Sequence, residues 1–251
     1  MKIGVISYLL RHHDTPTAMA FLQDTGFTNV ELDFRHADGL CDYRTQDAAG
    51  GARARVICLD HGITPHAYCV GGLNKSHIPA LRNVFEFTKG LGVEVIVGVL
   101  DPDILPELDA LCQEYQIYYA IENHRGNVFE AAETMLEAAE TMLEAVKRYS
   151  RYIGFNPDTG HFASAGLVAV DEVRKLEGRI YHCHFKDSDQ RLPLGSGSAD
   201  LLAVTRQLKR QGYDRLWSIE HYEYQGISDE DLRIGLVQAL AYVQELDVKT
   251  E

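Results

Sequence analysis

The sequence predicts a closed (β/α)8 barrel, and three observations support this prediction. Short runs of apolar and β-branched residues recur roughly every thirty residues along the 251-residue chain, with helical patterns between them. Eight such βα units in a chain of this length are typical of a barrel of eight parallel strands. No Gly-rich dinucleotide-binding pattern follows the first strand, which disfavours the alternative, a doubly wound open sheet.

Local signals place the elements in order. The first helix is predicted to have Thr15 as its N-cap, Pro16 at its first position and Gly26 at its end. In the last helix, Leu232 and Leu236 belong to an apolar stripe that repeats at helical spacing. The predicted strands are 3–7, 29–34, 63–70, 93–99, 117–121, 152–155, 180–185 and 216–219. The later helices are predicted at about 44–60, 76–91, 105–111, 128–149, 167–176, 198–211 and 229–246.

No linker divides the chain, so one domain is predicted over residues 1–251. Within the fifth helix the segment 131–137 is repeated directly at 138–144. Seven residues fall about 20° short of two helical turns, so the duplication keeps one apolar face. Met135, Leu136, Met142 and Leu143 are therefore expected on the same side of that helix.

Composition limits the class of partner. The chain carries 24 Lys and Arg against 37 Asp and Glu, a formal net charge of -13, and it has no basic run. Such a chain repels phosphate backbones, so nucleic-acid binding is not expected. The five cysteines form no C-x-x-C pair, which indicates reduced thiols and a cytoplasmic location. The N-terminal apolar run is too short for a signal peptide or a membrane span, so no membrane association is expected.

Four consecutive predicted strands lead into residues of metal-binding types. Glu122 follows the fifth strand, Asp158 lies in a Pro- and Gly-bounded turn after the sixth, His184 lies on the seventh, and Glu220 follows the eighth. Charged residues often follow a strand simply because the chain has left the core. In a (β/α)8 barrel, however, the C-terminal strand ends meet at one rim. Four in succession therefore predict a shared divalent-metal site.

Three carboxylates and one imidazole form a hard, oxygen-rich ligand set. That set suits Mn²⁺, Mg²⁺ or Co²⁺ better than a structural zinc ion, which would recruit thiolates. With four protein ligands, an octahedral ion would leave two positions for a substrate carbonyl and an adjacent hydroxyl, and it would stabilise an enediolate. A carboxylate on each side of the bound carbon could then remove and return a proton.

Four motifs carry a family resemblance: Ile-Glu-Asn-His at 121–124, Asp-Thr-Gly-His at 158–161, His-Cys-His-Phe-Lys-Asp at 182–187 and Ile-Glu-His at 219–221. They resemble the xylose-isomerase-like TIM-barrel superfamily, and within it the ketose 3-epimerases and hydroxypyruvate isomerases. The resemblance covers nearly the whole chain and implies a metal-dependent enzyme of carbohydrate metabolism, with Mn²⁺ as the first expected ion. It implies four metal ligands: Glu122, Asp158, His184 and Glu220.

The resemblance also implies individual roles. Glu122 and Glu220 would be the proton-transfer pair, and His161 would contact a substrate oxygen. The related epimerases place an arginine in the loop after the seventh strand, and Arg191 is the nearest match in this chain.

Other polar residues are weaker candidates. His66 is predicted at the end of the third strand, where it could line the pocket or be an inert core histidine. Lys186 lies two residues after His184 and should point to the interior, where an ion pair or a substrate hydrogen bond is favoured over a Schiff base. By the same alternation, His182 faces the same way as His184, either behind it or within the core.

Two predicted loops also carry residues that could bind a ligand. His12 and His13 follow the first strand, where an exposed loop pair is favoured over a place on the rim. The segment 195–198 is rich in Gly and Ser and could hold a phosphate, but Asp200 in the first turn of the next helix disfavours an anion there.

The hypothesis is a divalent-metal-dependent sugar isomerase or epimerase that acts on a small sugar or polyol. The first alternative is an inosose-dehydratase-like lyase, which would share proton removal but expel a hydroxyl. An apurinic-endonuclease-like metal hydrolase is less favoured, because it needs more histidines and a basic face. Assembly into a homo-oligomer is compatible with the sequence but not specified by it.

Overall fold

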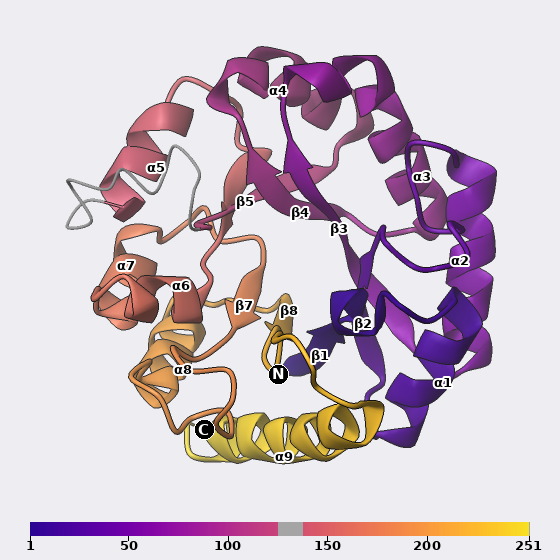
Figure 1. The fold of residues 1–251 in the computed structure, drawn as a ribbon. Coiled ribbons are helices and arrows are strands. Elements are labelled where there is room, and N and C mark those ends of the chain that lie inside the picture. The colour runs from indigo at the N-terminus through magenta and orange to yellow at the C-terminus, as the bar shows by residue number, and fades with distance from the viewer. Residues whose placement is uncertain (125–137, 251) are drawn as a thin grey trace.

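A computed structural model describes residues 1–124 and 138–250. In the described chain, eight parallel strands follow the order β6-β5-β4-β3-β2-β1-β8-β7, and helices surround them (Figure 1). The strands are β1 (Lys2–Ile6), β2 (Asn29–Asp33), β3 (Thr64–Leu73), β4 (Val95–Leu100), β5 (Tyr118–Glu122), β6 (Ile153–Asn156), β7 (Cys183–Phe185) and β8 (Leu216–Ile219).

Two short bridges join the ends of this strand order. Phe155 pairs with Ile180, and Asp158 pairs with His184, both in parallel. These pairs connect the β6 and β7 regions and nearly close the sheet, so the predicted (β/α)8 barrel is confirmed. The second pair also sets two predicted site residues side by side at the C-terminal rim.

The helices alternate with the strands as predicted, although several are shorter or split. They are α1 (Thr15–Asp24), α2 (Ala48–Asp60), α3 (Leu81–Leu91), α4 (Leu105–Tyr115), α5 (Ala138–Val146), α6 (Thr159–Ser164), α7 (Ala169–Lys175), α8 (Leu201–Arg210) and α9 (Asp229–Val248). Three short 3-10 helices add to these: η1 (Ser7–Leu10), η2 (Lys75–Ala80) and η3 (Pro102–Ile104).

Helix caps account for two differences from the prediction. Asp14, not Thr15, caps α1, because its carboxylate accepts the Thr17 N–H at 2.8 Å. Asp200 caps α8 in the same way through the Ala203 N–H, so this helix starts later than predicted. Asp and Thr are both good N-caps, so side-chain contacts decided which residue took that role.

The second copy of the duplicated heptad lies in α5. Met142 is fully buried and Leu143 packs partly against the core, as expected. Met135 and Leu136, from the first copy, lie outside the described residues.

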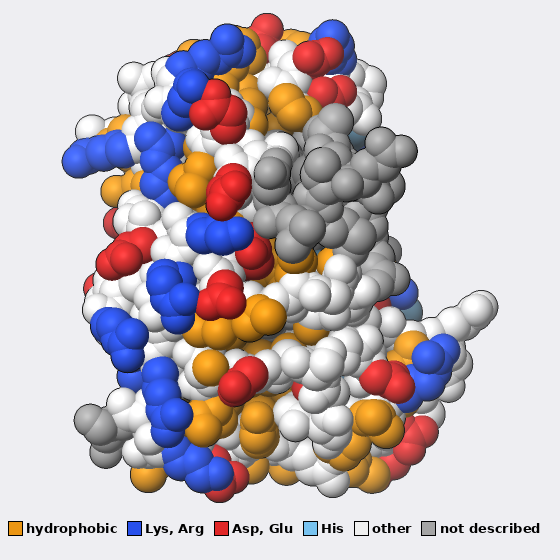
Figure 2. Space-filling view, turned by 90° about the vertical axis from the view of Figure 1, so that its left-hand side faces the viewer, with side chains coloured by type: hydrophobic (Ala, Val, Ile, Leu, Met, Phe, Trp, Pro, Cys, Tyr) orange, Lys and Arg blue, Asp and Glu red, His pale blue; other side chains and the backbone are white. Residues whose placement is uncertain are grey.

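The surface carries both signs of charge. On the side of the barrel shown in Figure 2, basic and acidic side chains lie among hydrophobic ones. Within the described residues, no helix is both long enough and apolar enough to cross a membrane.

Helices α2 and α3 pack closely where Gly90 of α3 lies against the backbone of Ala48 in α2. A Cβ added at Gly90 would lie 2.0 Å from the Ala48 carbonyl oxygen, and backbone cannot move aside as a flexible side chain can. We therefore expect Gly90→Ala to lower the free energy of unfolding by about 1–3 kcal/mol, measured by urea denaturation. Gly72→Ala is the matched control, because an added Cβ there meets no atom within 4 Å. Equal stability of the two variants would contradict the close approach.

Candidate active site

Four predicted residues meet at the C-terminal rim. Glu122, Asp158, His184 and Glu220, here called the quartet, each offer one ligand atom, and these atoms all lie within 4.8 Å of one another. All four side chains are buried. They come from the end of β5, the start of α6, β7 and the residue after β8. The structure thus brings together the residues that the strand-end pattern singled out.

Hydrogen bonds fix Asp158 in place and leave one of its carboxylate oxygens without a hydrogen bond from the described residues. Its Oδ1 accepts the His161 N–H at 2.8 Å and caps α6, which begins where the sequence predicted only a turn. The Asn123 amide clamps the Asp158 backbone, accepting from its N–H at 2.7 Å and donating to its carbonyl at 3.1 Å. Oδ2 is buried and has no hydrogen bond from the described residues. A buried carboxylate oxygen without a donor fits a group that binds a cation.

His184 presents its Nδ1 to the quartet. Its Nε2 lies 2.9 Å from Glu31 Oε2, and an ionised carboxylate can only accept, so this nitrogen carries the hydrogen. Nδ1 then faces Glu220 Oε2 at 2.9 Å. A carboxylate behind an imidazole is the usual arrangement that orients a metal-binding histidine. The quartet therefore fits a divalent ion.

Glu31, on β2, is the main site residue that the sequence analysis missed. It is fully buried inside the barrel and also contacts His182 Nε2 at 2.8 Å and accepts from Ser218 Oγ at 2.7 Å. Burial acts to raise its pKa, but the charges of His184 and His182 outweigh burial and hold the pKa well below its usual value. The prediction that His182 and His184 face the same way is confirmed. The available signal was the position of a lone Glu between Val30 and Leu32 in a strand.

Lys186 supplies a positive charge beside the carboxylates. Its Nζ lies 3.4 Å from Glu220 Oε2, 3.6 Å from Asp158 Oδ2 and 3.7 Å from Glu223 Oε2. Burial acts to lower its pKa, but Glu220 and Asp158 outweigh burial and raise the pKa above its usual value. The side chain is therefore an ammonium ion paired with the site, which is consistent with the predicted ion pair.

The two glutamates of the quartet have pKa values shifted in opposite directions. Burial, reinforced by the charge of Glu220, raises the pKa of Glu122. Burial also acts to raise the pKa of Glu220, but the charges of Lys186 and His184 outweigh it and hold the pKa well below its usual value. Neighbouring carboxylates with separated pKa values can serve as an acid and a base.

His161 lies at the edge of the quartet. Its Nε2 is 3.6 Å from Asp158 Oδ2 and 3.8 Å from Glu122 Oε1. Burial lowers its pKa, which favours a neutral imidazole. Ligand atoms of Glu122, His124 and His161 also lie within 4.8 Å of one another, so a second ion could in principle share Glu122.

A cavity of 360 Å³ opens in front of Glu122 and Glu220. Tyr8, Arg35 and Glu223 also line it, and the sequence analysis identified none of them. Arg35 is fixed in place, because it donates to both oxygens of Asp33 at 2.9 and 2.7 Å and its guanidinium lies 3.9 Å above the Tyr8 ring. Arg35 lies two residues after the end of β2, so the strand-end pattern could have identified it.

The two other predicted substrate residues, His66 and Arg191, are not among the residues that line the 360 Å³ cavity. His66 is near the start of β3, where it contacts Asn29 at 2.8 Å and lines a different cavity with Lys2 and Leu216. These residues begin their strands, so His66 lies toward the opposite end of the barrel and its predicted place at the strand's end was wrong. The strand extends to Leu73 instead. Arg191 is exposed, with its guanidinium 5.7 Å from the Tyr224 ring.

The Gly- and Ser-rich loop at 195–198 already binds an internal anion. The carboxylate of Asp187 accepts the backbone N–H groups of Gly195, Gly197 and Ala199 at 2.9–3.1 Å. A phosphate would have to displace this carboxylate, which agrees with the expectation that the loop does not bind one.

A family sequence profile, the xylose isomerase-like TIM barrel, matches residues 103–243. The chain therefore belongs to the xylose isomerase-like TIM barrel family. An uncharacterized protein, MJ1311, from Methanocaldococcus jannaschii is 29% identical over 126 residues, which span 47% of this chain and only 41% of that protein.

Solved structures show the same fold. A D-tagatose 3-epimerase-like protein has a TM-score of 0.77 at 21% identity, covering 100% of this chain and 98% of its own. The probable 3-DHS dehydratase AsbF of Bacillus anthracis has a TM-score of 0.72 at 15% identity, covering 97% and 99%. Ketose 3-epimerases recur among the similar structures. At these identities the likeness establishes the fold.

Proposed function

We propose that this chain is a divalent-metal-dependent sugar isomerase or epimerase that transfers a proton on a small sugar. The observation that carries the proposal is the buried quartet, in which ligand atoms of Glu122 and Glu220 lie within 4.8 Å of each other and of those of Asp158 and His184. The pair borders a 360 Å³ cavity, a volume suited to a small molecule. Membership of the family and the recurrence of ketose 3-epimerases among similar folds support the same activity.

Glu122, Asp158, His184 and Glu220 would hold the metal ion. Three carboxylates and one imidazole favour Mn²⁺, with Mg²⁺ and Co²⁺ as the other candidates. When bound, the ion supplies Lewis-acid polarisation of a substrate carbonyl and thereby makes the neighbouring C–H more acidic.

The remaining steps belong to side chains of the chain. One glutamate of the pair removes the proton from the carbon beside the carbonyl, and the other returns a proton to the substrate. The Lys186 ammonium balances the carboxylate charge and can donate a hydrogen bond to a substrate oxygen. His161, neutral and partly buried at the edge of the quartet, would orient a second oxygen. Arg35 and Tyr8 would form the wall opposite these groups.

The alternative is a lyase that removes the same proton and then expels a hydroxyl group. The fold that this chain shares with a probable dehydratase supports this alternative. Product mass distinguishes the two. Purified protein would be incubated with a panel of ketoses, aldoses and keto-polyols in D₂O with Mn²⁺, Mg²⁺ or Co²⁺. We expect isomers of the substrate in which deuterium has replaced one hydrogen. We also expect this activity to be lost when a chelator is added. Products lacking one water would instead establish the lyase, and no turnover of any carbohydrate would contradict both.

A metal hydrolase acting on nucleic acid is a weaker candidate. The cluster of Glu122, His124 and His161 favours it by offering a second ion position. The net charge of -13 opposes it. Nicking of abasic DNA by the purified protein would establish it.

The proposed enzyme acts in the cytoplasm. All five cysteines are free and buried in the structure, which is consistent with a reducing compartment. Assembly into a homo-oligomer stays a prediction.

A further inference from the structure

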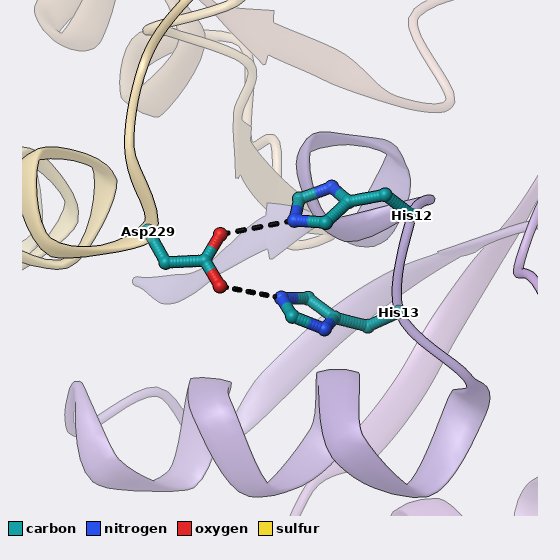
Figure 3. Close-up of side chains that lie close together, drawn as sticks. All are labelled: His12, His13 and Asp229. Atoms are coloured by element: carbon teal, nitrogen blue, oxygen red, sulfur yellow. Dashed lines mark hydrogen bonds and ion pairs between the residues drawn. The ribbon is translucent and has the colours of Figure 1, made fainter.

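A second cluster of metal-binding side chains lies apart from the quartet. His12 and His13 follow η1, and Asp229 is the first residue of α9. His12 Nε2 lies 2.9 Å from Asp229 Oδ1, and His13 Nε2 lies 2.9 Å from Oδ2 (Figure 3). The sequence analysis favoured an exposed loop pair here, but the structure joins both imidazoles to one carboxylate.

We propose that His12, His13 and Asp229 form a zinc site that fastens the first βα loop to the last helix. Two imidazole nitrogens and one carboxylate oxygen are preferred ligands of Zn²⁺, whereas Mg²⁺ prefers oxygen alone. The set differs from the oxygen-rich quartet, so the two sites would select different ions. Water would complete the coordination, because His12 and Asp229 expose about half of their side chains.

The distances suit a tetrahedral ion. With metal–ligand bonds of about 2.0–2.1 Å, neighbouring ligand atoms are about 3.3 Å apart. The two 2.9 Å distances join the imidazoles to different oxygens of Asp229, and one ligand atom from each of the three residues lies within 4.8 Å of the other two. Rotation of these side chains would bring the three ligand atoms to the spacing that the ion needs.

The backbone holds the ligands from both sides. The His13 N–H donates to the Leu10 carbonyl at 2.9 Å, and the His13 carbonyl accepts the Ala37 N–H at 3.0 Å. Asp229 follows Ser228, the N-cap of α9, whose hydroxyl accepts the Asp231 N–H. Such anchoring lowers the entropy cost of assembling three ligands from segments 216 residues apart.

The site lies on a surface next to the substrate cavity. His12 and Asp229 line a neighbouring cavity of 540 Å³ together with Glu223, and Glu223 also lines the 360 Å³ cavity in front of the quartet. Zinc at this position would fix the loop that follows β1 against the segment that follows β8.

The test measures bound zinc rather than activity. The Glu122→Gln/Asp158→Asn variant, which weakens the quartet, would be dialysed against Zn²⁺ and its metal content measured. We expect about one Zn²⁺ per chain and a rise in the midpoint of thermal unfolding. Adding His12→Gln and His13→Gln should remove both effects, since glutamine amides can still donate hydrogen bonds to Asp229 but seldom bind zinc.

His61→Gln in the same background is the matched control, because it removes a histidine that belongs to none of the candidate metal-binding groups of the described residues, and it should leave the zinc content unchanged. Retention of zinc by the His12→Gln/His13→Gln protein would overturn the proposal. Failure of the parent variant to bind zinc would overturn it as well. Neither result bears on the sugar chemistry, which is measured separately.

Discussion

Glu122→Gln and Glu220→Gln are each expected to lower kcat by about 10²–10⁴-fold, the usual contribution of a positioned acid or base. Glutamine keeps the shape of the side chain but can neither accept nor deliver the proton. Removal and return of the proton need one carboxylate each, so loss of either one should slow the whole transfer. Initial rates at saturating substrate would be measured for each variant.

Because both glutamates are also proposed metal ligands, bound metal must be measured on the same samples. We expect the loss of kcat to persist when enough Mn²⁺ is added to restore the parental metal content. Glu172→Gln is the control for removing a buried carboxylate, since Glu172 is buried on α7 and pairs with Lys175 outside the quartet. It should fold and keep parental turnover. Near-parental kcat in both quartet variants would contradict the proton-transfer role.

The quartet could be predicted from the sequence because its positions follow from topology. In a parallel barrel every strand ends at the same rim, so residues that follow successive strands are neighbours however far apart they lie in the chain. Correct prediction of where the strands end was enough to identify Glu122, His184 and Glu220. Asp158 was found for the same reason, although the sequence analysis described a turn where α6 begins.

Glu31 could not be found by this rule, because it lies inside a strand rather than at its end. A lone Glu between Val30 and Leu32 marks an unusual strand position, but its partners lie in and just before β7 and on β8, and the local sequence does not reveal them. His66 shows the opposite error. His66 was assigned to the end of the third strand although that strand was predicted over 63–70, and in β3, Thr64–Leu73, it is the third residue. The position of a residue along its strand decides which end of the barrel its side chain reaches.

Glu31→Gln is expected to weaken metal binding by about 10–100-fold, the usual effect of removing a carboxylate behind a metal-binding histidine. Glu31 accepts from Nε2 of His184 and so fixes which nitrogen carries the hydrogen, while Nδ1 faces the quartet and the Asn156 amide at 3.0 Å. A glutamine amide can donate as well as accept, so it no longer imposes that choice. Titration calorimetry with Mn²⁺ would measure the affinity directly, without depending on the identity of the sugar.

The same variant should also lower the free energy of unfolding of the metal-free protein. Breaking a buried ion pair costs about 3–5 kcal/mol, and the lower end is expected here because burial already lowers the pKa of His182, and His184 can lose its proton when its carboxylate partner is removed. Ser218→Ala is the matched control, since it removes one hydrogen bond to the same carboxylate, at 2.7 Å, and leaves the charge in place. That change should cost about 1.5–3 kcal/mol and leave the metal affinity close to parental, because the carboxylate still holds His184. If a folded Glu31→Gln protein bound Mn²⁺ as tightly as the parent, Glu31 would be a structural anchor of the barrel interior and would not position the metal ligand.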